Sequence, residues 1–220
     1  MKDRMIEMAK RKEQIKKNAI FEFQLDVQKA VALILNSLER WTGQKIHRHG
    51  PNFEETPARV ARAYTEIFEG LFDNGDQVKE ILSKTFPAKA TEMVVVGPVA
   101  VWSICAHHLL PVEMRVWLGY LPKKRVLGLS KLARLAELVA KKPGLQEDAT
   151  IELVDLLYKG LKPSGCGCYI RGRHMCMAMR GVKSNAITTS SQLVGSFLKA
   201  EIRSEFLAMI RADITKGDCL

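Results

Sequence analysis

The first third of the chain places its apolar residues at the spacing of helices. Apolar side chains recur at intervals of three and four between residues 27 and 41, which predicts one face of an amphipathic helix that Gly43 ends. A second helix is expected from the N-cap Thr56 and the first helical residue Pro57 to Gly70. A short helix over residues 78–82 should follow. The stripe of the first helix consists of Val27, Val31, Ile34, Leu38 and Trp41.

From Glu92 the pattern changes to that of strands. The segment EMVVVGPVAVWSI is rich in β-branched residues, and residues 114–120 alternate along the chain. Pro122 and the two lysines after it suit a hairpin turn, and residues 165–180 are predicted to form another strand. Helices are expected over residues 130–141, 146–158 and 198–210.

This order of elements predicts an α+β fold, with an antiparallel sheet that follows a helical N-terminal portion. The expected parts are a basic, partly helical or disordered arm (1–20), the helical portion (21–91), the sheet domain (92–212) and a frayed C-terminal tail (213–220). No internal repeat or low-complexity linker interrupts them.

Composition narrows the class of protein. The chain has 220 residues, 47% hydrophobic and 26% charged, which is enough apolar material for a core. It has no apolar run long enough for a membrane span and no secretory signal at its N-terminus, so we expect a cytoplasmic protein without a membrane partner. Five cysteines, an odd number, argue against a disulfide framework. Cys166 and Cys168 share a strand face and are predicted to be buried strand residues.

The charge is strongly positive. The net charge is +10, and the first 17 residues hold seven basic and three acidic side chains. Such a surface either only keeps the protein soluble or attracts a polyanion, such as nucleic acid or the phosphates of a nucleotide. The chain has neither an RNA-binding aromatic motif nor a helix-turn-helix signature, so a nucleic-acid partner is not expected.

The segment ICAHHLLP holds three metal-binding side chains within four positions, Cys105, His107 and His108. On a strand, Cys105 and His107 would share a face, whereas on a helical turn Cys105 and His108 would. One histidine is therefore expected to join Cys105 while its neighbour points elsewhere. The alternative is a packed cysteine beside a hydrogen-bonded histidine.

The segment RGRHMCMAMRG offers a third ligand. As a strand it would place His174, Cys176 and Arg180 on one face and three methionines on the other, as part of the core. Catalytic zinc sites use three protein ligands and leave a fourth position to water. Cys105, one of the two neighbouring histidines and Cys176 make such a set, which would free a remaining histidine for acid–base work.

Two helix starts carry further polar groups. Ser130 is a suitable N-cap, and Lys131 and Arg134 lie one turn apart at the positively polarised end of the same helix. A bound phosphate would explain two cations there, and a solvated surface pair is the alternative. Gln146 and Glu147 begin the next helix, where the carboxylate either complements the helix dipole or accepts hydrogen bonds from a guanine ring.

Together and in this order, the segments resemble the GTP cyclohydrolase I family of the tunnelling-fold group. The resemblance runs from about Val27 to Ile210. It implies the tunnelling fold, with helices on one side of the sheet, and a toroidal homodecamer of two pentamers with active sites at subunit interfaces. The motifs that carry it are ETPARVARAY, EMVVVGPVAVWSICAHHLLP, GYLPKKRVLGLSKLARL, LQE, RHMCMAMRGV and TTSSQLVGSF.

The resemblance also divides the polar residues by role. It implies a Zn²⁺ cofactor held by Cys105, His108 and Cys176, with His107 as the catalytic histidine beside the metal. His174 matches a second histidine that contacts the substrate. The other implied contacts are Ser130, Lys131, Arg134 and Arg180 for the triphosphate and Gln146 and Glu147 for the guanine edge, and Ser130 is also implied in catalysis.

The implied activity is the hydrolysis of GTP at C8 of guanine. Zinc would supply hydroxide to C8 while His107 protonates N7, and formate would leave. His174 and Ser130 would assist the rearrangement to 7,8-dihydroneopterin triphosphate, which begins pterin, folate or 7-deazaguanine biosynthesis. The alternatives are an enzyme on the same scaffold for another purine nucleotide and a non-catalytic, zinc-stabilised nucleotide-binding protein. Ala106, where the family usually has an acidic residue, is the departure nearest the site.

Overall fold

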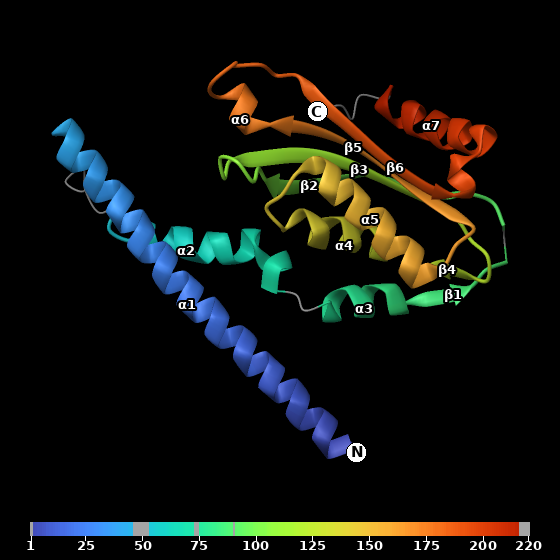
Figure 1. Cartoon of the computed structure of the whole chain (residues 1–220), viewed down its shortest axis with the longest axis horizontal. Helices are drawn as coiled ribbons and strands as arrows, with labels where there is room; N and C mark the ends of the chain where they lie inside the picture. Colours follow the sequence, from blue (N-terminus) through green and yellow to red (C-terminus); the bar gives the residue numbers. More distant parts are fainter. Residues whose placement is uncertain (1, 46–52, 73–74, 90, 216–220) are drawn as a thin grey trace. The chain divides into compact units, whose positions relative to one another are not determined.

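The computed structural model describes residues 2–45, 53–72, 75–89 and 91–215, and the chain divides into two compact units at Phe72 (Figure 1). The sequence places this boundary at residue 91 instead. The difference arises because helix α3 (Asp76–Ser83) packs on the helices of the second unit. No described helix combines the length and the apolar character that a bilayer crossing requires.

The first unit is a pair of packed helices, α1 (Lys2–Thr42) and α2 (Thr56–Ile67), followed by the short 3₁₀ helix η2 (Glu69–Phe72). The helix α1 is continuous, so the expected arm belongs to the same helix as the predicted amphipathic segment. Its first half is rich in Lys, Arg and Glu, which are good helix formers. Gly43 ends α1 with a φ of 71°, as predicted, whereas α2 starts one residue early, with Glu55 as the N-cap.

The buried face of α1 differs from the predicted stripe by one position. Leu35 is buried, whereas its neighbour Ile34 is 58% exposed. The ring of Phe23 lies edge-on to that of Phe68, with 6.2 Å between centroids. Gln24 donates a hydrogen bond of 3.0 Å to Thr65 Oγ1. The contact between α1 and α2 therefore combines apolar packing with one polar pair.

The second unit is built on a four-stranded antiparallel sheet in the order β2-β3-β5-β6. Its strands are β2 (Val94–Ile104), β3 (Pro111–Leu121), β5 (Gly165–His174) and β6 (Ile187–Gly195). This mixture of helices and an antiparallel sheet confirms the α+β class. The pattern did not predict β6, because its sequence ITTSSQLVG is mostly polar in its first half.

A second sheet pairs only β1 (Thr85–Pro87) with β4 (Arg125–Leu127). Because β4 pairs with β1 and not with β3, the turn at Pro122 is not the predicted hairpin turn. Leu127 is also anchored to the larger sheet, since its backbone N–H donates to Tyr120 Oη at 3.0 Å.

The four-stranded sheet has two ends, which differ in what they carry. Ile104, Pro111, His174 and Ile187 form the end that we name the cluster end, and Leu121, Gly165 and Gly195 form the far end. Figure 1 shows α6 (Met175–Ala178) at the cluster end and β4 at the other end of the sheet. At about 3.4 Å per residue, β3 separates the two ends by about 30 Å.

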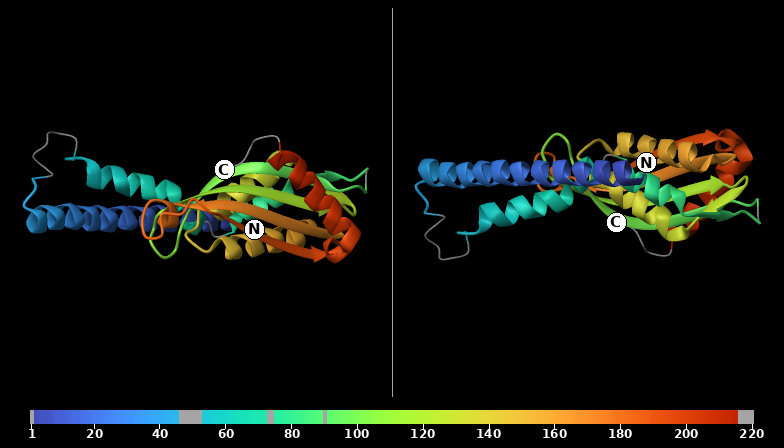
Figure 2. Two further views of the ribbon diagram at one scale, coloured as in Figure 1. Left: turned by 90° about the horizontal axis from the view of Figure 1, so that it is seen from above. Right: turned by 90° about the horizontal axis from the view of Figure 1, so that it is seen from below.

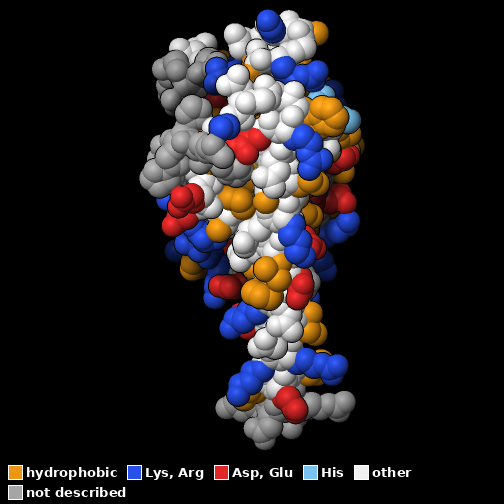
Figure 3. Space-filling model, turned by 90° about the vertical axis from the view of Figure 1, so that its left-hand side faces the viewer, with side chains coloured by type: hydrophobic (Ala, Val, Ile, Leu, Met, Phe, Trp, Pro, Cys, Tyr) orange, Lys and Arg blue, Asp and Glu red, His pale blue; other side chains and the backbone are white. Residues whose placement is uncertain are grey.

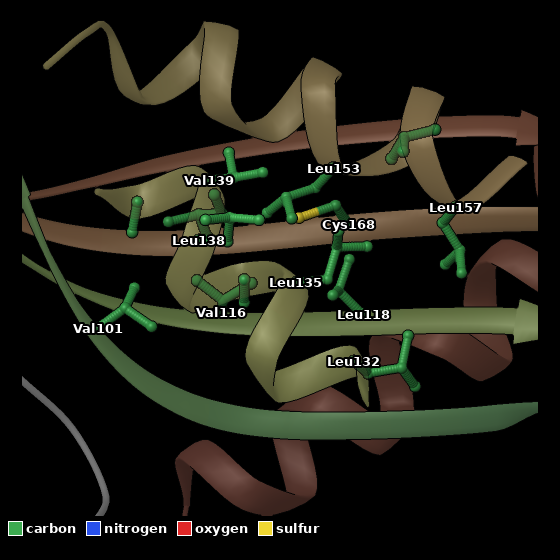
Figure 4. Packing of buried hydrophobic residues seen from close by; sticks show 14 of the residues in the cluster. Val101, Val116, Leu118, Leu132, Leu135, Leu138, Val139, Leu153, Leu157 and Cys168 are labelled. Carbon is green, nitrogen blue, oxygen red and sulfur yellow. The ribbon is translucent and has the colours of Figure 1, made fainter. Parts of the chain in front are cut away.

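One face of this sheet is covered by α4 (Leu129–Ala140) and α5 (Gln146–Leu161). Alternate residues of β3, such as Val116 and Leu118, pack there against Leu135 of α4 and Leu153 of α5 (Figure 4). This core also buries Cys166 and Cys168, which confirms them as buried strand residues.

The opposite face carries α7 (Ala200–Ile214) near the far end (Figures 1 and 2). Trp117 of β3 packs there with Phe206 and Ile210 of α7 and with Phe197 of the short helix η3 (Ser196–Leu198). The expectation of helices on one side therefore holds for α4 and α5 but not for α7. The expected tail begins inside α7, and its residues 216–220 lie outside the described part of the chain.

Candidate metal centre

The segment after β2 is a tight turn, and this decides between the two geometries that the sequence leaves open. The N–H of Leu109 donates to the carbonyl of Cys105 at 2.9 Å, and the N–H of Cys105 donates to the carbonyl of Leu110 at 2.9 Å. Leu109 adopts a φ of 52°, in the left-handed region. A helical turn brings the first and fourth residues together, so Cys105 and His108 lie on the same side.

Cys176 joins these two residues from α6, the single helical turn after β5. The ligand atoms of Cys105, His108 and Cys176 all lie within 4.8 Å of one another. Cys105 is buried, Cys176 is half-buried and His108 is exposed, so the group opens to solvent on one side. The three predicted ligands therefore converge in the structure.

Cys176 reaches this position because the chain coils after His174. The sequence predicts a strand to Arg180, but the N–H of Met179 donates to the carbonyl of Met175 at 3.0 Å, and the strand ends at His174. The predicted alternation of faces over residues 174–180 is therefore wrong. Met179 is 64% exposed, so the methionines do not form the core face that the alternation suggested.

The donor set suits a transition metal. Two thiols and one imidazole are the ligands that Zn²⁺ prefers, and ligands of one zinc ion lie within about 4 Å of each other. Cys105 Sγ is 3.9 Å from His108 Nδ1. Burial raises the pKa of the Cys176 thiol, and the adjacent Cys105 raises it further, while the guanidinium of Arg180 acts in the opposite direction. A cation between the two sulfur atoms would favour their thiolate forms.

His107 lies beside the three candidate ligands but is not one of them. Its Nδ1 is 3.9 Å from Cys105 Sγ, and its ring centroid is 6.2 Å from that of His108, with the two rings tilted by 60°. Both histidines are exposed, and histidine side chains reach the surface in Figure 3. Both histidines approach Cys105, but only His108 also lies close enough to Cys176 to complete a group of three ligand atoms.

His174, at the end of β5, meets the start of α5. Its Nε2 is 3.2 Å from Oε1 of Gln146. Burial lowers the pKa of His174, and the carboxylate of Glu147 opposes this shift. Glu147 is exposed, whereas Gln146 is only 4% exposed. Of the two residues expected to bind the guanine edge, only Glu147 is thus open to solvent.

Ser130, Lys131 and Arg134 do not join this group within one chain. They lie in the first turns of α4, which follows β4 and Leu127 near the far end of the sheet. The other end of α4 reaches the cluster end, where Ser103 Oγ donates to the carbonyl of Lys142 at 3.2 Å. At about 1.5 Å per residue, α4 separates the two by about 18 Å. Ser130 is also not the predicted N-cap, because α4 begins at Leu129 with Gly128 before it.

Arg180 is the one predicted triphosphate contact near the candidate ligands. It follows α6 and is exposed, and its charge acts on the Cys176 thiol. Sequence reasoning missed Gly172, Thr188 and Ser190, which surround the side chain of Gln146. A glycine inside a strand, which often marks a close approach, was the available signal for the first of them.

Comparison with known proteins gives a consistent result. The family model described as GTP cyclohydrolase I matches residues 27–211. The protein named GTP cyclohydrolase 1 from Clostridium perfringens is 40% identical over 186 residues, which cover 84% of this chain and 96% of the relative. The proteins of the same name from Desulforamulus reducens and Corynebacterium glutamicum are both 42% identical, over 84% and 88% of this chain and 95% and 96% of their own lengths.

One of the similar solved structures is that of the archaeosine synthase QueF-Like in its apo form. Its TM-score is 0.39 and its sequence identity is 12%, and the match covers 47% of this chain and 96% of the other. The relatives that share sequence and the family model carry the assignment, and the residues that the family model matches include the cluster end.

Proposed function

Because the chain belongs to the GTP cyclohydrolase I family, we propose that it is a zinc-dependent enzyme that hydrolyses GTP at C8, releases formate and forms 7,8-dihydroneopterin triphosphate. One observation carries this proposal. Cys105, His108 and Cys176 converge on one point, while His107 lies beside them without joining them. A site that only held a metal would not need this second histidine, whereas proton transfer to a substrate would.

Cys105, His108 and Cys176 would hold the zinc ion. Bound there, Zn²⁺ lowers the pKa of a water molecule and so makes it nucleophilic at neutral pH. The backbone holds Cys105 in place, because the N–H of Gly144 donates to the carbonyl of Ile104 at 3.1 Å. The loop between α4 and α5, which contains Gly144, thus fixes the backbone next to Cys105.

The other residues of the cluster end would bind GTP and move protons. His107 is exposed and close to Cys105, so its imidazole can reach the purine ring and donate a proton to N7. Glu147, in the first turn of α5, would accept hydrogen bonds from the guanine edge. Arg180 would contact the triphosphate, and His174 would assist the rearrangement of the ribose.

Ser130, Lys131 and Arg134 would complete the site from a second copy of the chain. In one chain they lie in the first half of α4, on the side of the far end and away from the candidate ligands. Copies arranged head to tail in a ring would bring the far end of one sheet to the cluster end of the next. This separation supports a homo-oligomer with the triphosphate bound across an interface, and the proposed homodecamer of two pentamers rests on the family resemblance.

The first test measures formate and a fluorescent pterin product from GTP, with and without a chelator, alongside metal analysis. The proposal expects both products, and it expects the chelator to abolish them. Formate from ATP or inosine triphosphate but not from GTP would favour another purine nucleotide as substrate. Bound zinc without formate from any of them would favour a non-catalytic nucleotide-binding protein.

The neighbouring histidines give a matched pair of variants for the catalytic role. His107→Ala should lower kcat by about 10²–10⁴-fold, the usual contribution of a general acid, while the protein keeps its zinc. His108→Ala should lose the zinc as well as the activity. An active His107→Ala variant, or one without metal, would contradict this division of roles.

Co-expression of two impaired variants tests the shared site, with GTP well below its KM. His107→Ala removes a group from the cluster end, and Lys131→Ala removes one from the far end. If each site combines the two ends of different copies, random mixed oligomers should restore about a quarter of the wild-type activity. Mixed oligomers no more active than the mean of the two parents would show that one chain supplies both groups.

A further inference from the structure

The side chain of Gln146 is held inside the protein by three acceptors. Its Nε2 lies 3.3 Å from the carbonyl of Ile170, 3.2 Å from the carbonyl of Thr188 and 3.0 Å from Ser190 Oγ. Carbonyl oxygens only accept hydrogen bonds, so they fix the NH₂ group of the amide on the side of β5 and β6. The oxygen of the amide must then face the other way.

That oxygen faces His174. Oε1 of Gln146 lies 3.2 Å from Nε2 of the imidazole. An amide oxygen only accepts, so this hydrogen bond requires the proton of His174 on Nε2. In the neutral ring, Nδ1 is then the nitrogen with the free lone pair.

We infer that Gln146 is a positioning residue, which fixes the ring and the tautomer of His174 and does not contact the guanine edge. Its donors are already bound within the protein and its oxygen is bound to His174, so it has little left to offer a base. This inference rests on the proposed function and deepens it. His174 then presents Nδ1 to the substrate, and Glu147 alone binds the guanine edge.

Gly172 supplies the space that this arrangement needs. A Cβ atom at position 172 would overlap Oε1 of Gln146, and it would also approach Cγ of Met114 at 3.5 Å. Gly172 lies on β5 two residues before His174, so the amide crosses the strand over the glycine on its way to the imidazole. The glycine, the amide and the histidine thus form one unit, and a side chain at 172 would break it without changing either partner.

The first experiment observes the tautomer directly and does not depend on activity. Long-range ¹H–¹⁵N correlation spectra of protein with ¹⁵N-labelled histidine distinguish the two neutral tautomers, and the His174→Gln variant assigns the signal. We expect His174 protonated at Nε2 in the wild type and a mixture of tautomers in Gln146→Met. A proton on Nδ1 in the wild type, or an unchanged spectrum in Gln146→Met, would overturn the inference even if the enzyme hydrolyses GTP.

The second experiment separates positioning from guanine binding by kinetics. Gln146→Met and Gly172→Ala should each lower kcat by about 10–100-fold, the usual effect of losing a partner that orients a site residue, with the KM for GTP changed by less than about threefold. If Gln146 binds guanine, its replacement should instead raise KM and weaken the preference for GTP over inosine triphosphate. That result would refute the inference and leave the proposed function intact.

Thr150→Val is the matched control. Thr150 is buried one turn further along α5, and its hydroxyl contacts the carbonyl of Gln146 and Ser190 Oγ, both at 2.7 Å, but it does not touch His174. Removing this hydroxyl loosens the same polar network while leaving two carbonyl acceptors for the amide. We expect kcat within about twofold of the wild type. A loss as large as that of Gln146→Met, with the variants equally folded and metal-loaded, would show general loosening and contradict the specific role.

Discussion

The two ends of the four-stranded sheet are built for different tasks. At the cluster end the strands run into turns, and Cys105, His108 and Cys176 meet where solvent can reach them. At the far end α7 covers the sheet, and Trp117 and Phe206 are almost completely buried. The candidate metal ligands therefore lie at the solvent-accessible end of the sheet, whereas the opposite face near the far end is closed by apolar packing.

The far end nevertheless carries three of the predicted substrate contacts, in the first turns of α4. Lys131 is partly exposed and Arg134 is exposed, at the helix end that already favours anions. A single copy does not explain their predicted contact with the triphosphate, because the candidate ligands lie at the other end of the sheet. If copies share the substrate site as proposed, the two ends of one chain are complementary halves, and a substitution can disable either end without the other.

The largest effect should come from the cluster end. Cys176→Ser should remove most of the bound zinc and lower kcat/KM by about 10³-fold or more, because the pKa of the nucleophilic water then returns towards that of bulk water. Metal analysis and the formate assay measure both effects. Cys168→Ala, which removes a buried thiol from the neighbouring strand, should keep the metal. Loss of zinc from that variant too would mean that the metal lies elsewhere.

The next effect should appear at the far end and leave the metal in place. A Cβ atom at Gly97 would overlap the ring and backbone of Trp117, so Gly97→Ala should lower the free energy of unfolding by about 3 kcal/mol. Chemical denaturation measures the loss, and the zinc content of the folded fraction should not change. Ala100→Ser, at an exposed position of the same strand, should cost less than about 0.5 kcal/mol. Equal costs would show that Trp117 can move aside.

A smaller effect is expected from the cations of α4. Lys131→Ala should lower kcat/KM for GTP by about 10–100-fold, mainly through KM, since one charge-assisted hydrogen bond to a phosphate is lost. Zinc content should stay at the wild-type level. Lys123→Ala, an exposed lysine in the turn before β4, is the control and should change neither parameter. A fall in zinc with Lys131→Ala would contradict the separation of the two ends.

The sequence predicts the strongly patterned elements of this fold and misses the others. Val94–Ile104 is rich in β-branched residues, and it is a strand. The sequence pattern does not predict strand β6, because its Thr and Ser residues do not alternate with apolar ones. The segment after His174 misleads in the opposite sense, since its alternating methionines imitate a strand while the chain coils into α6.

The site was predicted in part for a similar reason. The residue types and spacing pointed to Cys105, Cys176 and one of two histidines, but only the approach of His108 to both cysteines in the structure favours that histidine. The contact between Gln146 and His174 depends on three segments that are distant in sequence, and no local pattern reports it. Distances between the two ends of the sheet were likewise beyond the sequence, so the separation of Lys131 from the candidate ligands emerges only in the structure.

The smallest expected effect is on the free energy of unfolding at high pH, and it comes from a buried thiol near the far end of the sheet. Cys166 is fully buried near the far end, and burial, with a lesser contribution from Asp155, raises the pKa of its thiol from 9.0 to about 12. Below pH 9 both the folded and the unfolded chain keep this proton. Above pH 9 the unfolded chain releases it first, so the free energy of unfolding should fall as the pH rises from 9 towards 12.

The expected loss from Cys166 alone is about 1 kcal/mol between pH 9 and pH 10. Urea midpoints of the wild type and of Cys166→Ala at pH 8, 9 and 10 measure it, and the variant should lose stability less steeply. Other titrating groups contribute equally to both proteins and cancel in the comparison. Equal slopes would mean that Cys166 ionises as easily in the folded chain as in the unfolded one. The far end would then admit water, and its contrast with the cluster end would not hold.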